Sequence, residues 1–248
     1  FYLSSIPDEF NRENAYDLAL EAVGDGFADY LVDAFHSCMM FYRARETSVA
    51  AFLALFQTKT APGSDFRILH ARNEMQEIPE ALASPLNVHT GSAVRSLRRG
   101  TEGWEVCFEE KTRTYSYVVL ATTAGAAREL LAEGPAIHRD LLRATRYAAT
   151  VNLSFEMERT ALGQAHCFYI PYKESPLVAE FTNEALKGDN LVREGKSLCN
   201  VGLHEAAALE LASLSDEDLF SRVERELHRL RPDIGELKPH DLQRWSEA

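Results

Sequence analysis

The stretch YVVLATTAGAARELL (117–131) reads as a buried strand that turns sharply into a helix. Its first part, 117–121, is an unbroken apolar run, as expected of a strand that is covered on both faces. Thr122 and Thr123 can cap the segment that follows, and 124–131 is rich in helix-forming residues up to the Gly134-Pro135 stop. Strand–turn–helix units of this kind build sheets that bind nucleotides, and such sheets usually carry a glycine-rich phosphate loop.

The sequence shows no such loop. Gly24-Asp25-Gly26 is the only GxG pattern, but it follows a predicted helix and no third glycine completes the GxGxxG spacing. We interpret this segment as a turn between two helices. A P-loop, a GxSxG nucleophile motif and an HExxH metal motif are also absent from the sequence.

Composition limits the classes of function. The 248 residues suffice for one large domain or two small ones, and the net charge of −12 argues against a nucleic-acid partner. Because no run of about 18 apolar residues occurs, we expect no transmembrane segment and predict a cytoplasmic protein. The four scattered cysteines, without a CxxC pair or a zinc spacing, predict free buried thiols and no metal site. They are Cys38, Cys107, Cys167 and Cys199.

Hydrophobic periodicity predicts a helical N-terminal region, a β-meander, a β-rich region and a late amphipathic helix. The predicted helices cover 15–23, 27–42, 48–57, 76–83, 124–131 and 215–231. The predicted strands cover 88–97, 104–109, 114–121, 151–157, 166–171, 177–182, 196–204 and 237–245. Ser215 and Asp218 fit a capping box at the start of the late helix.

Several segments occur in a characteristic order. The first is EMQEIPEALASPLNVHTGSAVRSLRRGTEGWEVCFEEKTRTYSYVVLATTAGAARELL, and it is followed by YAATVNLSFEM, KGDNLVREGKSLCNVGL, LSDEDLFSRVERELHRL and RW. This order resembles the flavin-containing amine oxidase and protoporphyrinogen oxidase superfamily, in its protoporphyrinogen-oxidase-like branch. There, a helix reading roughly "lpeaLa" precedes a strand with a valine, and a three-stranded meander returns through "VVlAtpa" into the FAD-binding domain.

The resemblance implies an α/β (α+β) chain, with an antiparallel-sheet substrate domain and packed helices, plus a partial FAD-domain β-meander and strand–helix unit. The implied domains are 1–83, the helical part of the substrate domain; 84–134, the returning limb of the FAD-binding domain; and 135–248, the β-rich part with one long helix. The superfamily's glycine-rich loop and its second flavin motif would then lie outside the chain. We therefore expect an internal piece of a longer FAD enzyme, or a natural truncated paralogue.

The resemblance also implies cofactor-binding residues. Val94 matches the position whose backbone N–H and C=O meet the adenine of FAD. Ala121, Thr122 and Thr123 match the turn that approaches the cofactor, and Trp245 matches the tryptophan that opens the final segment towards the flavin. Each of these residues also has a purely structural interpretation, either in a strand edge or as a helix cap. No catalytic residue is identified.

The sequence departs from the superfamily at two places. Asn73-Glu74 stands before Met75 where the family commonly has a Gly-Gly pair, so the close backbone approach that glycine permits is lost there. Amine oxidases carry a flavin-facing lysine near the strand that begins around 149–151, and this chain has Thr150 or a neighbour there. The second departure favours protoporphyrinogen-oxidase-like or desaturase-like chemistry over monoamine oxidation.

The function implied is that of the substrate-binding portion of an FAD-dependent oxidoreductase, which passes hydride from a small organic substrate to FAD. We expect the isolated chain to be inactive, to retain no FAD, and to self-associate through the exposed meander limb. The alternative is a non-catalytic interaction domain, or one that binds an apolar ligand without flavin. A GxGxxG motif upstream of the chain would decide between the two.

Overall fold

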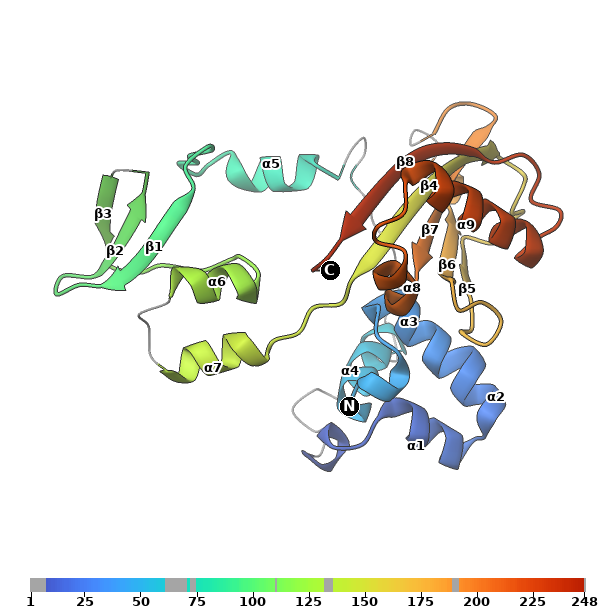
Figure 1. Cartoon of the computed structure of the whole chain (residues 1–248), viewed down its shortest axis with the longest axis horizontal. Helices are drawn as coiled ribbons and strands as arrows, with labels where there is room; N and C mark the ends of the chain where they lie inside the picture. The colour runs from blue at the N-terminus through green and yellow to red at the C-terminus, as the bar shows by residue number, and fades with distance from the viewer. Residues whose placement is uncertain are drawn as a thin grey trace. The chain divides into compact units, whose positions relative to one another are not determined.

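The computed structural model describes residues 8–60, 71, 75–109, 111–131, 136–188 and 192–247. Apart from the last two residues, the chain divides into two compact units, and each is described by itself (Figure 1). The large unit comprises Phe1–Glu77 and Ala148–Ser246, and the small unit comprises Ile78–Tyr147. Helices combine with antiparallel sheets in a mixed α/β chain, which confirms the predicted fold class.

The large unit is built on a five-stranded antiparallel sheet with the strand order β5-β6-β7-β4-β8. Its strands are β4 (Thr150–Glu158), β5 (Cys167–Tyr169), β6 (Val178–Asn183), β7 (Lys196–Leu203) and β8 (Lys238–Trp245). In β4 the apolar residues alternate with polar ones, and Val151, Leu153, Phe155 and Met157 are all buried. This alternation places one apolar face of the sheet inwards, as predicted from the sequence.

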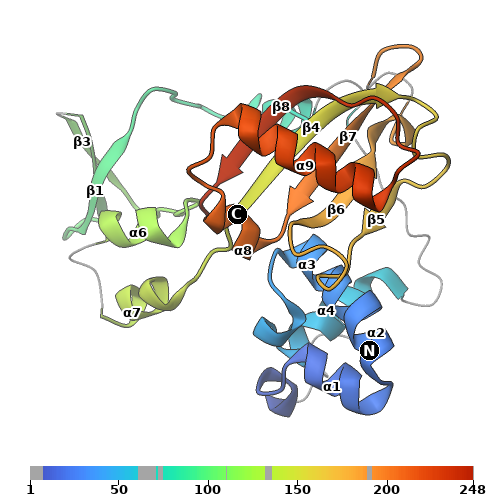
Figure 2. The same ribbon diagram turned by 45° about the vertical axis from the view of Figure 1, so that its right-hand side comes forward.

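Helix α9 (Asp216–Leu230) covers that apolar face, and Figure 2 shows it lying across the strands. Ser215 caps the helix by accepting a hydrogen bond from the backbone N–H of Asp218, as its sequence predicts. Leu219, Val223 and Leu227 share one buried cluster with the strands, joined by α8 (Glu205–Glu210). Burying each of these side chains stabilises the fold by roughly 1.5–3 kcal/mol.

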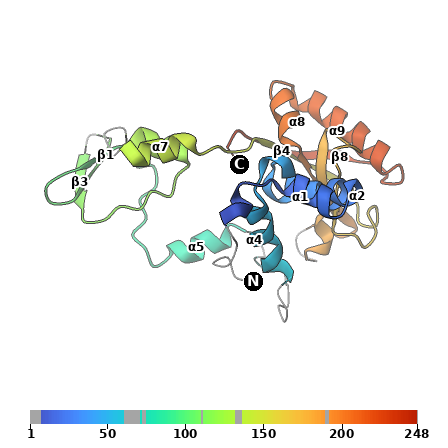
Figure 3. The same ribbon diagram turned by 90° about the horizontal axis from the view of Figure 1, so that it is seen from below.

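The N-terminal part of the large unit is helical. Its elements are η2 (Asp8–Asn11), α1 (Ala15–Ala22), α2 (Asp25–Phe27), the π-helical turn η3 (Ala28–Asp33), α3 (Ala34–Met40), η4 (Ala44–Glu46) and α4 (Val49–Thr60). Figure 3 shows α1, α2 and α4 from below. The predicted helix 27–42 is therefore a succession of three segments that ends at Phe41, where φ is 62°. Helix α3 contacts β5 and β6 of the sheet.

The small unit contains a three-stranded antiparallel meander, β1-β2-β3. Its elements are β1 (Val94–Arg99), β2 (Trp104–Phe108), β3 (Lys111–Tyr115), α6 (Ala124–Leu130) and α7 (Ala136–Ala144); α5 (Glu77–Ala83) begins at the unit boundary. Gly103 has a φ of 155°, and a Cβ there would lie 2.5 Å from the carbonyl oxygen of Tyr115. The first hairpin therefore requires glycine at this position.

The prediction of a strand at 114–121 was wrong. Glu109, with a φ of 53°, allows a tight turn that pairs Phe108 with Lys111, so the third strand runs earlier in the sequence. Residues 117–121 follow a bend and pair with no strand in the described part of the chain. Tyr117 and Val119 are 91% and 88% exposed, so the apolar run is not a buried strand in this structure.

Other boundaries shifted as well. The first meander strand begins at Val94 rather than at residue 88, and helices α7 and α8 were not predicted. The Asn73-Glu74 pair and the Gly134-Pro135 stop lie outside the described residues. Among the helices that the structure describes, none is long and apolar enough to cross a membrane.

Candidate functional site

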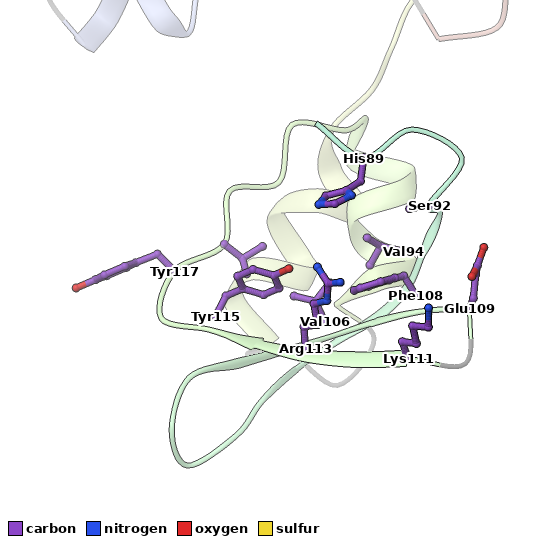
Figure 4. A pocket seen from close by; sticks show the side chains of 11 residues that line it. His89, Ser92, Val94, Val106, Phe108, Glu109, Lys111, Arg113, Tyr115 and Tyr117 are labelled. Atoms are coloured by element: carbon purple, nitrogen blue, oxygen red, sulfur yellow. The ribbon is translucent and has the colours of Figure 1, made fainter. Parts of the chain in front are cut away.

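A hollow of about 450 Å³ opens on one face of the meander (Figure 4). Val94, Val106 and Phe108 supply apolar side chains from β1 and β2. Lys111 and Arg113 of β3 add positive charge, and the Arg113 guanidinium lies 5.4 Å from the centre of the Phe108 ring. The hollow therefore combines an apolar surface with two cations and one carboxylate, that of Glu109. The remaining lining residues are His89, Ser92, Tyr115, Tyr117 and Val118.

A second hollow, of about 510 Å³, shares Val94 and Val106 with the first. It is lined by β1, by the extended segment 118–122, and by Ala126, Glu129 and Leu130 of helix α6. Three residues predicted to bind the cofactor, Val94, Ala121 and Thr122, are brought together here from two separate segments. They meet because α6 packs against β1 and carries the preceding turn with it.

The other two predicted residues lie elsewhere. Thr123 occupies the N-cap position of α6, but its side chain makes no capping hydrogen bond. Instead, the backbone N–H of Ala124 donates to the hydroxyl of Tyr147 at 2.9 Å. Trp245 belongs to the large unit, where it pairs with Thr150 at the end of β8 and is 51% exposed.

The hollows fit one part of FAD. An apolar floor and the nearby Lys111 and Arg113 suit an adenosine group and its phosphates. By contrast, the described residues contain no strand–glycine loop–helix unit to hold a pyrophosphate. Gly24 has a φ of 112° and lies between α1 and the short helix α2. Asp25 and Gly26 belong to α2, so only Gly24 of the predicted turn lies outside a helix. The residues that the structure describes therefore fit the adenosine end of the cofactor.

The large sheet has a second face, which is polar. Asn152 and Ser154 of β4, Asn200 of β7, and Glu180 and Thr182 of β6 all point to this side and are half-buried. Ser154 donates a hydrogen bond to the side chain of Asn200. Neighbouring strands thus place a row of hydrogen-bonding groups on this side of the sheet.

Gly202 makes room for Glu180 on this polar face. The two residues are paired across β6 and β7, and a Cβ at Gly202 would lie 3.1 Å from Cγ of Glu180. The carboxylate is the acceptor for two thiols. Cys38 of α3 donates to its Oε2 at 2.7 Å, and Cys167 of β5 does so at 3.6 Å.

Sequence spacing did not reveal this thiol–carboxylate cluster, because its members come from three distant elements. All four cysteines are free thiols; Cys38 and Cys199 are buried as predicted, whereas Cys107 and Cys167 are partly exposed. The hydrogen bond with Cys167, burial and the charge of Glu180 all raise the pKa of Cys38. Burial, with a smaller contribution from the neighbouring thiols, raises the pKa of Tyr169 to about 12.

An ion pair between the buried Asp33 and the partly exposed Arg43 links the helical region to the rest of the large unit. Asp33 is 1% exposed and accepts hydrogen bonds from Arg43 at 2.8 and 3.0 Å. The Arg43 guanidinium lies 3.9 Å from the centre of the Tyr172 ring, which in turn packs edge-on against His204. Burial, with a smaller contribution from Arg43, lowers the pKa of His204 to about 4. These contacts indicate a structural role.

Comparison with protein families gives a match over nearly the whole chain. Residues 4–248 match the family model of flavin containing amine oxidoreductases. No curated protein sequence matches the chain.

Several solved structures share the fold. An oxidoreductase from Methanosarcina mazei superposes with a TM-score of 0.76 at 15% identity, over 94% of this chain and 56% of that chain. A protein from Exiguobacterium sp. 255-15, named for protoporphyrinogen oxidase, gives 0.72 at 14% identity, over 98% and 57%. A redesigned putrescine oxidase gives 0.74 at 15% identity, over 97% and 55%. The chain thus spans a little over half the length of these proteins.

Proposed function

The chain belongs to the flavin containing amine oxidoreductase family, and we propose that it forms the substrate-binding portion and one limb of the cofactor site of an FAD-dependent oxidoreductase. The small unit would contact the adenosine part of FAD, and the large unit would bind a small organic substrate. The whole enzyme would transfer hydride from that substrate to the flavin, which supplies the electron-accepting chemistry.

The observation that carries this proposal is the convergence of Val94, Ala121 and Thr122 on one hollow. Val94 is the first residue of an edge strand, so its backbone lies at a position that a ligand can reach. Lys111 and Arg113 line the first hollow, which shares Val94 with this one, and they would attract the phosphates because cations hydrogen-bond phosphate oxygens strongly. Thr123 and Trp245 remain predicted contacts that rest on the family resemblance alone.

We propose that the substrate binds to the polar face of the large sheet. Asn152, Ser154 and Asn200 present donors and acceptors there, which orient a bound molecule without a reactive group of their own. Thr150 stands near the place where amine oxidases carry a lysine. It is buried and donates to the carbonyl of Leu203 at 3.4 Å, which supports a branch without that lysine.

The adenosine contact can be tested on this chain with ADP as the probe. Isotope-labelled chain would be titrated with ADP, and amide shifts around Val94 would be followed by NMR. Val94→Pro removes the N–H that the proposal uses, at a strand end where proline is tolerated. Val94→Ala is the matched control, because it removes the side chain and keeps the N–H.

We expect ADP to bind Val94→Ala within about twofold of the parent chain, and Val94→Pro up to about tenfold more weakly, the effect of one hydrogen bond. Equal affinity in all three chains would refute the backbone contact. If ADP causes no shifts but an apolar dye perturbs the same hollow, the alternative of an apolar-ligand-binding domain gains support.

A further inference from the structure

We propose that Cys38, Cys167 and Glu180 form a binding site for a zinc ion in the large unit. One sulfur atom from each cysteine and a carboxylate oxygen of Glu180 all lie within 4.8 Å of one another. The three ligands come from α3, β5 and β6, so the fold rather than a local sequence motif assembles them. The proposal is independent of the oxidoreductase function above.

The distances are close to those of a tetrahedral zinc site. Typical zinc–sulfur and zinc–oxygen bonds place a sulfur and an oxygen ligand about 3.5 Å apart around the metal. The Sγ of Cys167 already lies 3.6 Å from Oε2 of Glu180. The Sγ of Cys38 lies at 2.7 Å and must move away by roughly 1 Å, a shift that a side-chain rotation can provide.

The surroundings hold the ligands in place. Cys38 is 4% exposed, and the packing of α3 against the sheet holds its backbone beside β5 and β6, so only its side chain has to rotate. Gly202 leaves the space that the Glu180 side chain occupies, and Tyr169 stands opposite Glu180 in the neighbouring strand. Because Cys167 and Glu180 are only partly buried, a water molecule can complete the fourth position.

The ligand set selects the class of metal. Two sulfur donors disfavour magnesium and calcium, which prefer oxygen ligands, and they suit zinc. Binding would release the two thiol protons to solvent, and the zinc ion would replace them as the partner of the carboxylate. A disulfide between the two cysteines would instead leave Glu180 without these two thiol donors.

The test uses metal-free, reduced chain and cobalt(II) as a spectroscopic probe for zinc. Thiolate coordination produces a charge-transfer band, and zinc should displace cobalt with one equivalent per chain. Cys38→Ser and Cys167→Ser should each weaken zinc binding at least about 100-fold, above the range seen when supporting residues are lost. Glu180→Gln keeps an oxygen ligand but removes its charge, so it should retain the band and bind at least about tenfold more weakly.

Cys107→Ser is the matched control, since Cys107 is also a partly exposed thiol but lies in the small unit. It should bind zinc like the parent chain. Circular dichroism would establish that each variant is folded; if Cys38→Ser is not, Cys167→Ser and Glu180→Gln decide. The proposal fails if the reduced chain gives no thiolate band, or if Cys107→Ser loses as much affinity as Cys167→Ser.

Discussion

The two units differ sharply in how much apolar surface they bury for themselves. In the large unit Leu153, Phe155 and Leu219 are fully buried in one continuous cluster between the sheet and α9. Among the strand residues of the small unit only Leu97 and Val106 are buried, and all five residues of β3 are exposed. The large unit therefore resembles an ordinary domain core, whereas the small unit presents apolar surface to its surroundings.

This contrast shows that an apolar sequence is buried in one unit and exposed in the other. In β4 the alternating pattern predicts burial, and the structure supplies the covering helix. In 117–121 the continuous pattern also predicts burial, yet Tyr117 and Val119 are exposed. An apolar run thus indicates a segment that favours burial. Whether the segment is buried depends on the elements that pack against it.

Cavity-forming substitutions in each unit test the contrast and have the largest expected effect. Phe155→Ala should lower the free energy of unfolding by about 3–5 kcal/mol, because Phe155 is fully buried and packs against Phe220. Leu97→Ala in the small unit should have a smaller effect on its own unit, since the open hollow allows neighbours to relax. Trp245 and Trp104 provide a fluorescence signal in each unit, and chemical denaturation would measure both. Equal losses would contradict the comparison.

Acid should affect the large unit through His204. Its pKa in the folded chain is about 4, below the ordinary value of 6.5, so between these values the unfolded chain binds a proton that the folded chain excludes. Stability is therefore fully present above about pH 6.5 and falls, by up to about 3 kcal/mol, as the pH drops towards 4. The slope should flatten in His204→Asn, followed through Trp245. An unchanged slope would contradict the assignment.

The small unit should depend more on its turns than on its core. Gly103→Ala should lower its stability by about 1–3 kcal/mol, because the added Cβ would meet the carbonyl oxygen of Tyr115 at 2.5 Å. Gly91→Ala is the control. Its φ is 67° but the space around it is open, so only the cost of the left-handed conformation for alanine, about 1 kcal/mol, applies. Thermal melts followed at Trp104 would compare the two, and equal shifts would argue against the clash.

The sequence predicted most of the large unit, because its signals are local. Periodicity identified β4 and α9, and Ser215 identified the helix start, since each depends on neighbours within a few residues. The superfamily resemblance was confirmed by the match over residues 4–248. Val94, Ala121 and Thr122 came from that resemblance alone, and the structure adds only that they line one hollow.

Two features could not be predicted from local pattern. The cluster of Cys38, Cys167 and Glu180 forms only when α3 packs on the sheet, so no spacing in the sequence encodes it. The position of the third meander strand depends on Glu109 adopting a left-handed conformation, which is uncommon for a residue other than glycine. Hydrophobic periodicity predicts neither non-local packing nor an unusual backbone angle.

The smallest expected effect concerns the exposed run 117–121. Because its apolar side chains are unpaired in the described part of the chain, we predict that two copies associate through it at high concentration. Burying one valine contributes roughly 1.5–3 kcal/mol, so Val119→Lys should weaken association at least about tenfold. Leu141→Lys, at another exposed apolar position in the same unit, should leave association unchanged. Light scattering over a dilution series measures both, and a monomer at every concentration would show that the exposed run is not an association surface.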